Sequence, residues 1–169
     1  TTSVTLTAGT AAAADLISID GMTTEAVNAS AITTLTGTAA QITAAYAANT
    51  AGTITGLGNE TVTASDSGSV AATVLTSLDA LTSGVADFAS VTTLTGTAAQ
   101  ITAAYAANTA GTITGLGNET VTASDSGTVA ATVLTNLDAL TTGAVDFASV
   151  TTLTGTAAQI TAEIGRAHV

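Results

Sequence analysis

The chain of 169 residues contains no cysteine, proline or tryptophan, and only 2% of its residues are aromatic and 8% charged. The lack of cysteine excludes a disulfide framework and a thiolate metal site, and the scarcity of aromatic residues excludes a core of large rings. One Lys or Arg stands against twelve Asp and Glu, so the net charge is −11. Such a chain repels phosphate, which argues against nucleic acid and anionic membranes as partners.

The sequence consists mainly of small residues. Threonine (40), alanine (38) and glycine (16) make up more than half of the chain. The sequence has no apolar run long enough to span a membrane and no basic start followed by an apolar stretch. It therefore predicts no membrane insertion and shows no signal peptide. Small side chains bury little apolar area, so we expect stability to come from contact between neighbouring units.

The strongest signal is an internal repeat, in which residues 33–91 recur as residues 92–150. The two copies are identical at 54 of 59 positions, and residues 1–32 and 151–162 match parts of the same unit. We therefore interpret residues 1–162 as a single array of repeats.

Each 59-residue unit also divides into two related halves. A shift of 32 positions places Ile101 on Val133 and Gly111 on Gly143. The structural unit is therefore expected to be a coil of about 30 residues, and such coils are typical of solenoids.

The last seven residues, 163–169, break the repeat. They resemble the in-frame translation of a widely used sequencing adapter, so we interpret them as a non-native tail that holds the only Arg, Arg166, and the only His, His168. On this interpretation the chain is a fragment cut at both ends, with eleven native acidic residues (twelve less Glu163). The alternative is a genuine C-terminal cap that shields the last coil.

The first half of the unit predicts a helix. Thr97 and Gln100 fit a capping box, and Gly111 is placed to end the helix in the left-handed conformation. One stripe of apolar residues recurs at helical spacing: Leu94, Ala98, Ile101 and Tyr105.

The second half predicts a similar helix. Residues 125–128 supply N-cap candidates, and Gly143 is expected to end the helix. We expect helices of about 12 residues in both halves. The corresponding apolar stripe is Val129, Val133, Leu137 and Leu140.

Between the helices the pattern alternates with a period of two, which is typical of half-buried strands. Residues 115–118 separate two of these strands as a turn. The predicted strands are 112–114, 120–122, 144–147 and 150–153.

These elements predict an α/β solenoid with two strand-plus-helix coils per 59-residue repeat. Parallel strands would lie on one face and short Ala-rich helices on the other, joined by right-handed crossovers. An all-β parallel solenoid is the alternative, because threonine, valine and glycine also favour it.

The sequence offers little for catalysis, and we expect no enzyme. A nucleophile needs a neighbouring base, and His168 lies in the interpreted tail. Asp79, expected in mid-helix, and Asp66, expected at a helix start, are better explained by solvation and capping than by acid–base chemistry. The segment 56–60 is rich in glycine but lacks the residues of a phosphate loop, so we interpret it as a turn.

Six carboxylates could repeat along one edge of a stack and bind calcium. Calcium takes six to eight oxygen ligands, whereas each coil offers one or two carboxylates. We therefore expect no cofactor, with calcium as the alternative and a dilute acidic surface as the simpler explanation. The six residues are Glu60, Asp66, Asp87, Glu119, Asp125 and Asp146.

Paired threonines in the predicted strands form the one candidate binding face. Stacked coils would turn them into a flat array of hydroxyl and methyl groups, which resembles the ice-binding face of some antifreeze solenoids and could also hold a glycan. The simpler explanation is ordinary β-propensity together with hydroxyl ladders between coils, since threonine is abundant throughout the chain. The eight residues are Thr53, Thr55, Thr61, Thr63, Thr112, Thr114, Thr120 and Thr122.

Three segments, 91–99, 111–116 and 137–143, resemble repeats of giant cell-surface proteins of marine cyanobacteria, the swimming-motility surface protein type of Synechococcus. The resemblance covers residues 1–162 and carries over no functional residues. It implies secretion, display at the cell surface and a structural role.

From residues and resemblance together we expect a structural segment, such as a spacer, stalk or coat, of a long extracellular or cell-surface protein. Its expected partners are neighbouring repeats of the same chain, with other surface proteins or glycans as further candidates. The alternative function is a binding solenoid that uses the Thr-rich face or the acidic edge.

Overall fold

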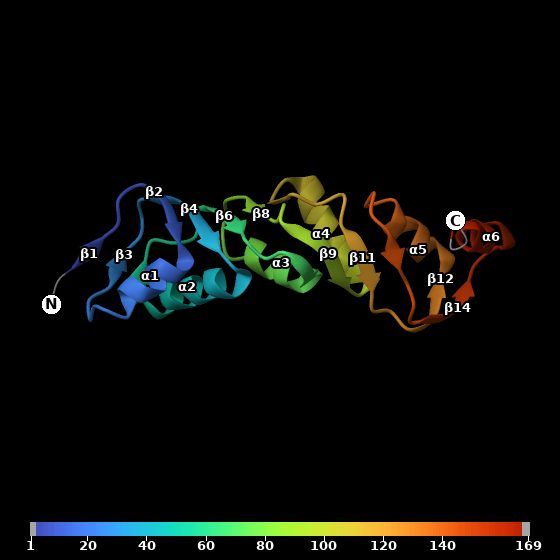
Figure 1. Ribbon diagram of the computed structural model, residues 1–169, viewed down its shortest axis with the longest axis horizontal. Helices are drawn as coiled ribbons and strands as arrows, with labels where there is room; N and C mark the ends of the chain where they lie inside the picture. The colour runs from blue at the N-terminus through green and yellow to red at the C-terminus, as the bar shows by residue number, and fades with distance from the viewer. Residues whose placement is uncertain (1–2, 167–169) are drawn as a thin grey trace.

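The computed structural model describes residues 3–166, which form a rod with its termini at opposite ends (Figure 1). The elements repeat as strand–strand–helix units, so the fold is α/β and the all-β alternative is wrong. Residues 167–169, including His168 of the interpreted tail, lie outside the described residues.

Long and short helices alternate along the described part of the chain. The six helices are α1 (Ala13–Asp20), α2 (Ala39–Ala51), α3 (Ala72–Asp79), α4 (Ala98–Ala110), α5 (Ala131–Asp138) and α6 (Ala157–Arg166). Helices α2 and α4 have 13 residues each, whereas α1, α3 and α5 have 8. The predicted helix length is therefore found only in the first half of the unit.

The long helices have the predicted ends. In α4 the Thr97 side chain accepts the backbone N–H of Gln100, and the Gln100 side chain accepts the backbone N–H of Thr97. Gly111 ends the helix with φ of 82°, in the left-handed region. The capping box and the C-terminal glycine are both confirmed, and α2 repeats them.

The short helices differ from the prediction at both ends. Residues 125–128 do not cap α5, because its N-cap is Ala130, which makes no side-chain cap hydrogen bond. Gly143 does not end α5 either, since the helix stops at Asp138. A Cβ at Gly143 would lie 2.2 Å from the carbonyl oxygen of Glu119. This glycine is needed for close approach of two backbone segments rather than for a helix end.

The strands form four sheets, in which every pairing is parallel. In spatial order, the first sheet contains β1 (Val4–Thr5), β3 (Val27–Asn28) and β5 (Ile54–Thr55). The second contains β2 (Gly9–Ala12), β4 (Ile32–Gly37), β6 (Thr61–Ala64), β8 (Ala86–Asp87) and β10 (Ile113–Thr114). The third contains β7 (Gly68–Ala71), β9 (Val91–Gly96), β11 (Thr120–Ala123) and β13 (Val145–Asp146). The fourth contains β12 (Gly127–Ala130) and β14 (Val150–Thr154).

Successive sheets follow the 59-residue repeat. Strands β7, β9, β11 and β13 of the third sheet correspond to β2, β4, β6 and β8 of the second, one repeat earlier. The chain passes between these sheets, from β6 in the second to β7 in the third and back to β8 in the second. The strands are therefore divided among several staggered sheets along the rod rather than joined in one.

The core is a stack of buried aliphatic residues contributed once per coil. In the second sheet the strand register brings Leu35, Val62, Ala86 and Ile113 side by side, and all four are fully buried. Helix α4 adds Ile101 and Ala104, also fully buried. Because each coil supplies only a few small side chains, most of the core contacts link one coil to the next.

In α5 the buried side differs from the predicted stripe. Ala131, Leu134 and Leu137 are buried, whereas Val133 is only partly buried. Val129 belongs to β12 and Leu140 follows the helix. Leu94 of the first-half stripe is buried but belongs to strand β9.

Candidate functional site

The eight candidate threonines lie at the surface, as predicted. Six of them are exposed, and Thr63 and Thr122 are half-buried. The apolar residue between each pair points inward, and Ile54, Val62 and Val121 are fully buried. The alternation of the strands is therefore confirmed, but a binding function for this face does not follow from exposure alone.

Three of the eight threonines bond to the preceding coil: Thr53, Thr112 and Thr55, whose Oγ1 donates to the carbonyl oxygen of Val27 at 3.4 Å. Thr53 Oγ1 donates to Asp20 Oδ2 at 2.9 Å, and Thr112 Oγ1 donates to Asp79 Oδ2 at 3.0 Å. Each of these two bonds joins residues that are 33 positions apart. Asp79 is the last residue of α3 rather than a mid-helix residue, so its carboxylate reaches the next coil. Its other oxygen, Oδ1, is buried without a hydrogen-bond partner.

The outer face of the second sheet is not a uniform threonine array. Along one row the register places Thr36 beside Thr63, Thr63 beside Asp87, and Asp87 beside Thr114. In the third sheet Thr122 likewise lies beside Asp146. A carboxylate therefore interrupts both of these threonine rows, and any ligand of this face would meet negative charge.

Glu60 and Glu119, two of the calcium candidates, are buried, with 1% of each residue exposed. Glu119 Oε2 accepts the hydroxyl of Tyr105 at 2.8 Å, and the backbone N–H of Gly117 donates to both carboxylate oxygens at 2.9 and 3.1 Å. Tyr46 and Glu60 form the same pair one repeat earlier. These carboxylates anchor the turn between β10 and β11, and its copy between β5 and β6.

Burial also acts on the two tyrosines. It raises the pKa of Tyr46 and of Tyr105 well above the ordinary value, because the phenolate form would lose its hydration, and the adjacent glutamate adds to the shift. The sequence analysis missed these pairs. The signal that could have revealed them is that the only tyrosine and the only glutamate of each full repeat are always 14 positions apart.

Asp66 and Asp125 do cap helices, but not those that follow them. Asp125 Oδ2 accepts the backbone N–H of Ala98, the first residue of α4, at 2.6 Å. Asp66 does the same for Ala39 in α2, also at 2.6 Å. Each aspartate therefore satisfies a free N–H group of a helix that began 27 positions earlier, in the preceding coil.

The remaining two candidates, Asp87 and Asp146, close turns after their strands. Their Oδ1 atoms accept the backbone N–H groups of Ala89 and Ala148 at 3.1 and 2.9 Å. Within the described residues, no three acidic, histidine or cysteine side chains come together in a group that could hold a metal ion. The six carboxylates therefore have different structural roles: two bond to buried tyrosines, two cap helices and two close turns.

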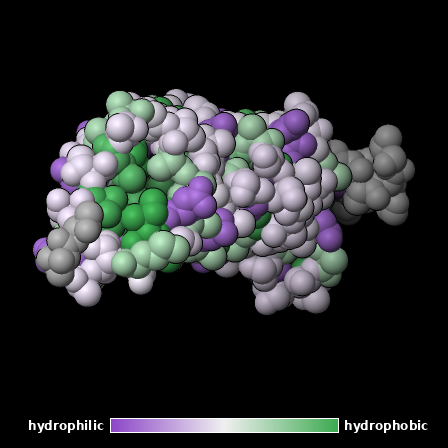
Figure 2. All heavy atoms as spheres, turned by 60° about the vertical axis from the view of Figure 1, so that its left-hand side comes forward, coloured by the Kyte–Doolittle hydropathy of each residue, from purple (hydrophilic) through white to green (hydrophobic). Residues whose placement is uncertain are grey.

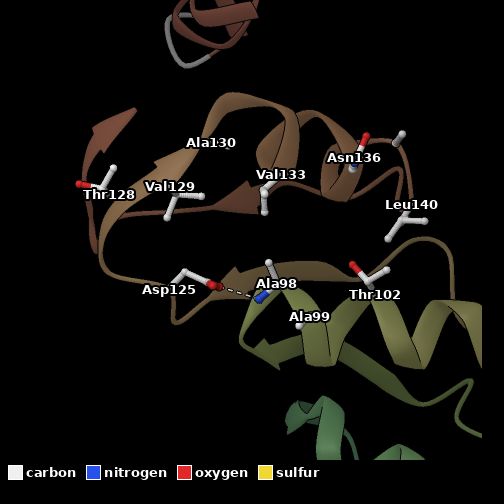
Figure 3. Close-up of a pocket in the computed structure, with 11 residues that line it drawn as sticks. Ala98, Ala99, Thr102, Asp125, Thr128, Val129, Ala130, Val133, Asn136 and Leu140 are labelled. Atoms are coloured by element: carbon white, nitrogen blue, oxygen red, sulfur yellow. Dashed lines mark hydrogen bonds between the residues drawn. The ribbon is translucent and has the colours of Figure 1, made fainter. Parts of the chain in front are cut away.

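A groove of about 970 Å³ opens between α4 and α5 (Figure 3). Its one carboxylate, Asp125, bonds to Ala98 at the groove wall. Helix α4 contacts α3 more extensively than α5, and the small alanines on this side of α4 leave the space open. The apolar lining is Ala98, Ala99, Val129, Ala130, Val133, Ala139 and Leu140, and the polar lining is Thr102, Asp125, Thr128 and Asn136.

Comparisons of the chain with protein-family models, curated proteins and solved structures return no match. None of the helices described is both long enough and apolar enough to cross a membrane. The structure is a repeating α/β array in which each of the six candidate carboxylates bonds to a nearby turn, a buried tyrosine or a helix of the preceding coil.

Proposed function

We propose that this chain is a structural repeat segment, a spacer, stalk or coat, of a long secreted or cell-surface protein, built as an open α/β solenoid without catalytic activity. The observation that carries the proposal is the use of carboxylates between coils. Asp66 and Asp125 cap helices of the preceding coil, and Asp20 and Asp79 accept hydroxyls of the following one.

These bonds join each coil to its neighbour, so the same contact can be repeated as the rod becomes longer. An enzyme gathers its titratable groups at one place, whereas here the same bond recurs at each 59-residue step. The two full repeats are identical at 54 of 59 positions. Nearly identical units form nearly identical junctions, as an extended array requires. Surface display is supported only by the resemblance to cell-surface repeats.

The experiment is a length series of polypeptides with two, three, four and six copies of the 59-residue unit. In a one-dimensional array each added copy contributes one unit and one junction. The unfolding midpoint should therefore rise and level off, while the longest dimension in X-ray scattering grows linearly. A midpoint independent of copy number, or a compact particle, would contradict the spacer function.

The second candidate is binding by the Thr-rich face. It is supported by the exposure of Thr55, Thr61, Thr114 and Thr120 on the strands. Thermal hysteresis tests ice binding, and a melt with and without millimolar calcium tests the acidic edge, because a ligand of the folded state raises the midpoint. The spacer function predicts no hysteresis and an unchanged melt.

A further inference from the structure

The groove between α4 and α5 has the unpaired edge of a strand in its wall. Thr128, Val129 and Ala130 of β12 line one wall, and the first residues of α4 line the other (Figure 3). Strand β12 pairs with β14 on one side, and no strand of residues 3–166 pairs with it on the other. In the interior of the rod, β7 is likewise the edge strand of the third sheet, directly before α3. The free edge is therefore a property of the 59-residue repeat.

The backbone of this edge strand alternates between its partner and the groove. The N–H of Gly127 donates to the carbonyl oxygen of Ser149 at 3.3 Å, so Gly127 faces β14. In β7 the carbonyl oxygen of Val70 likewise faces β9, where it accepts the hydroxyl of Thr95 at 3.4 Å. Because neighbouring residues of a parallel strand point to opposite edges, the N–H and C=O of Thr128 face away from β14, on the side of the groove. These groups can pair with an added strand.

The side chains of the groove favour an occupant that is partly apolar and partly basic. Seven of the eleven lining residues are apolar, and Asp125 is the only charged one. Its Oδ2 atom accepts the N–H of Ala98, which leaves the Oδ1 atom for a second donor. The chain as a whole carries a charge of −11, and Figure 2 shows strongly hydrophilic residues at several separate places on the face that it draws. The field around the groove is therefore negative.

We propose that this groove, and its copy beside β7, binds an extended segment of another protein in which apolar residues alternate with lysine or arginine. The segment would pair edge-on with β12 through main-chain hydrogen bonds, as peptides do when they add a strand to an exposed sheet edge. Its apolar side chains would pack between α4 and α5, and one basic side chain would reach Asp125.

Charge decides against a second copy of this chain as the occupant. The one Lys or Arg of the chain is Arg166, which lies in the segment that breaks the repeat. The repeats therefore have no basic side chain to place beside Asp125, whereas a basic partner is attracted by the whole acidic rod.

The groove recurs with the repeat. Helix α2 contacts α3 as sparsely as α4 contacts α5, and Asp66 bonds to Ala39 as Asp125 bonds to Ala98. A longer array would hold such segments once per 59 residues. The proposal goes beyond the spacer function and does not rest on it, because binding to a single groove is independent of the outcome of the length series.

The experiment is isothermal titration calorimetry of the purified chain with the peptide Val-Lys-Val-Lys-Val-Lys. We expect a dissociation constant of about 10–100 µM, in the range of weak, transient contacts. Three matched peptides separate the contributions: the same peptide methylated at every backbone nitrogen, Val-Glu-Val-Glu-Val-Glu and Ser-Lys-Ser-Lys-Ser-Lys. They remove the main-chain donors, the positive charge and the apolar side chains, respectively, and each should bind more weakly by about tenfold or more.

Two double variants place the binding in the groove. Ala40→Trp/Ala99→Trp introduces a large ring into each groove, because Ala99 belongs to the lining and Ala40 is its counterpart one repeat earlier. Ala44→Trp/Ala103→Trp adds the same rings at exposed positions of the same helices and is the control. We expect the first variant to bind the Val-Lys peptide about tenfold more weakly and the second to bind it as the wild type does, with both folded by circular dichroism.

Several results would overturn the proposal. They are no binding at about 1 mM peptide, equal binding by any of the three matched peptides, and wild-type binding by Ala40→Trp/Ala99→Trp. Self-association of the chain that the same variant abolishes would assign the groove to a second copy and would also overturn it.

Discussion

The carboxylate of Asp125 accepts the backbone N–H of Ala98 at 2.6 Å, across the boundary between one coil and the next. Ala98 begins α4, whose N-terminal N–H groups have no partner within the helix. The capping box satisfies two N–H groups locally, and Asp125 supplies the third bond from 27 positions further along the chain. The following coil therefore adds a bond that stabilises the start of a helix in the preceding coil.

This dependence predicts the effect of removing the aspartate. Asp125→Ala and Asp66→Ala should each lower the free energy of unfolding by about 1 kcal/mol, the usual value of a lost helix cap. Urea denaturation followed by circular dichroism measures the change. Glu25→Ala, which removes an exposed carboxylate near the N-terminal end, serves as the control and should have little effect. Equal losses in all three variants would contradict a capping role.

Removing one partner of the buried Tyr105–Glu119 hydrogen bond should lower the stability of the protein. Tyr105→Phe leaves Glu119 buried without its hydroxyl donor, so the free energy of unfolding should fall by about 1–3 kcal/mol. Thr109→Val, which removes a hydroxyl bonded to a carbonyl of its own helix, is the matched control and should cost less. A Tyr105→Phe variant as stable as the wild type would show that the bond contributes nothing.

The same tyrosines predict an alkaline loss of stability. Burial raises the pKa of Tyr46 and Tyr105 above the ordinary value of 10, so above pH 10 the unfolded chain releases protons that the folded chain retains. Stability is therefore fully present below the ordinary tyrosine pKa and falls as the pH rises above it. The chain has no cysteine, and its one Lys or Arg is Arg166, so no other side chain should titrate there. Thermal unfolding as a function of pH measures the loss, which should be absent in the double variant Tyr46→Phe/Tyr105→Phe.

A larger residue in place of Gly143 should clash with a neighbouring backbone segment. A Cβ at this position would lie 2.2 Å from the carbonyl oxygen of Glu119, so Gly143→Ala must displace one of two packed backbone segments. We expect a loss of about 1–3 kcal/mol, typical of overpacking. Gly21→Ala is the control, because its nearest neighbours are at 3.6 Å and its φ of −68° suits alanine. Chemical denaturation of both variants should show a loss only for Gly143→Ala.

Partial filling of the groove between α4 and α5 should stabilise the protein. Val133→Ile adds one methylene at a partly buried position in its lining, and burial of that group should raise stability by about 0.8 kcal/mol. Thr132→Val, at an exposed position of the same helix, should leave stability nearly unchanged. A destabilised Val133→Ile variant would mean that the groove closes in solution.

Local signals were sufficient where a structure depends on a few neighbouring residues. The capping box of Thr97 and Gln100 and the left-handed end at Gly111 are satisfied within one turn of the helix, so they could be predicted. The exposed threonines follow in the same way from the period of two along each strand. By contrast, residues 125–128 were expected to cap a helix, but Gly127 and Thr128 begin β12, because pairing with β14 outweighs their local preference.

The 59-residue period and its two halves could be predicted from the amino-acid sequence alone, as could the long helices with their caps and the alternation of the strands. The pairing of each carboxylate with its coil depends on how the coils stack in three dimensions. Asp125 reaches Ala98 because stacking brings together residues 27 positions apart. The staggered sheets were likewise decided by stacking, since β6 pairs with strands 27 positions before it and 24 after it. Such distances carry no periodic signal within a single coil, and for that reason the junctions between coils could not be predicted.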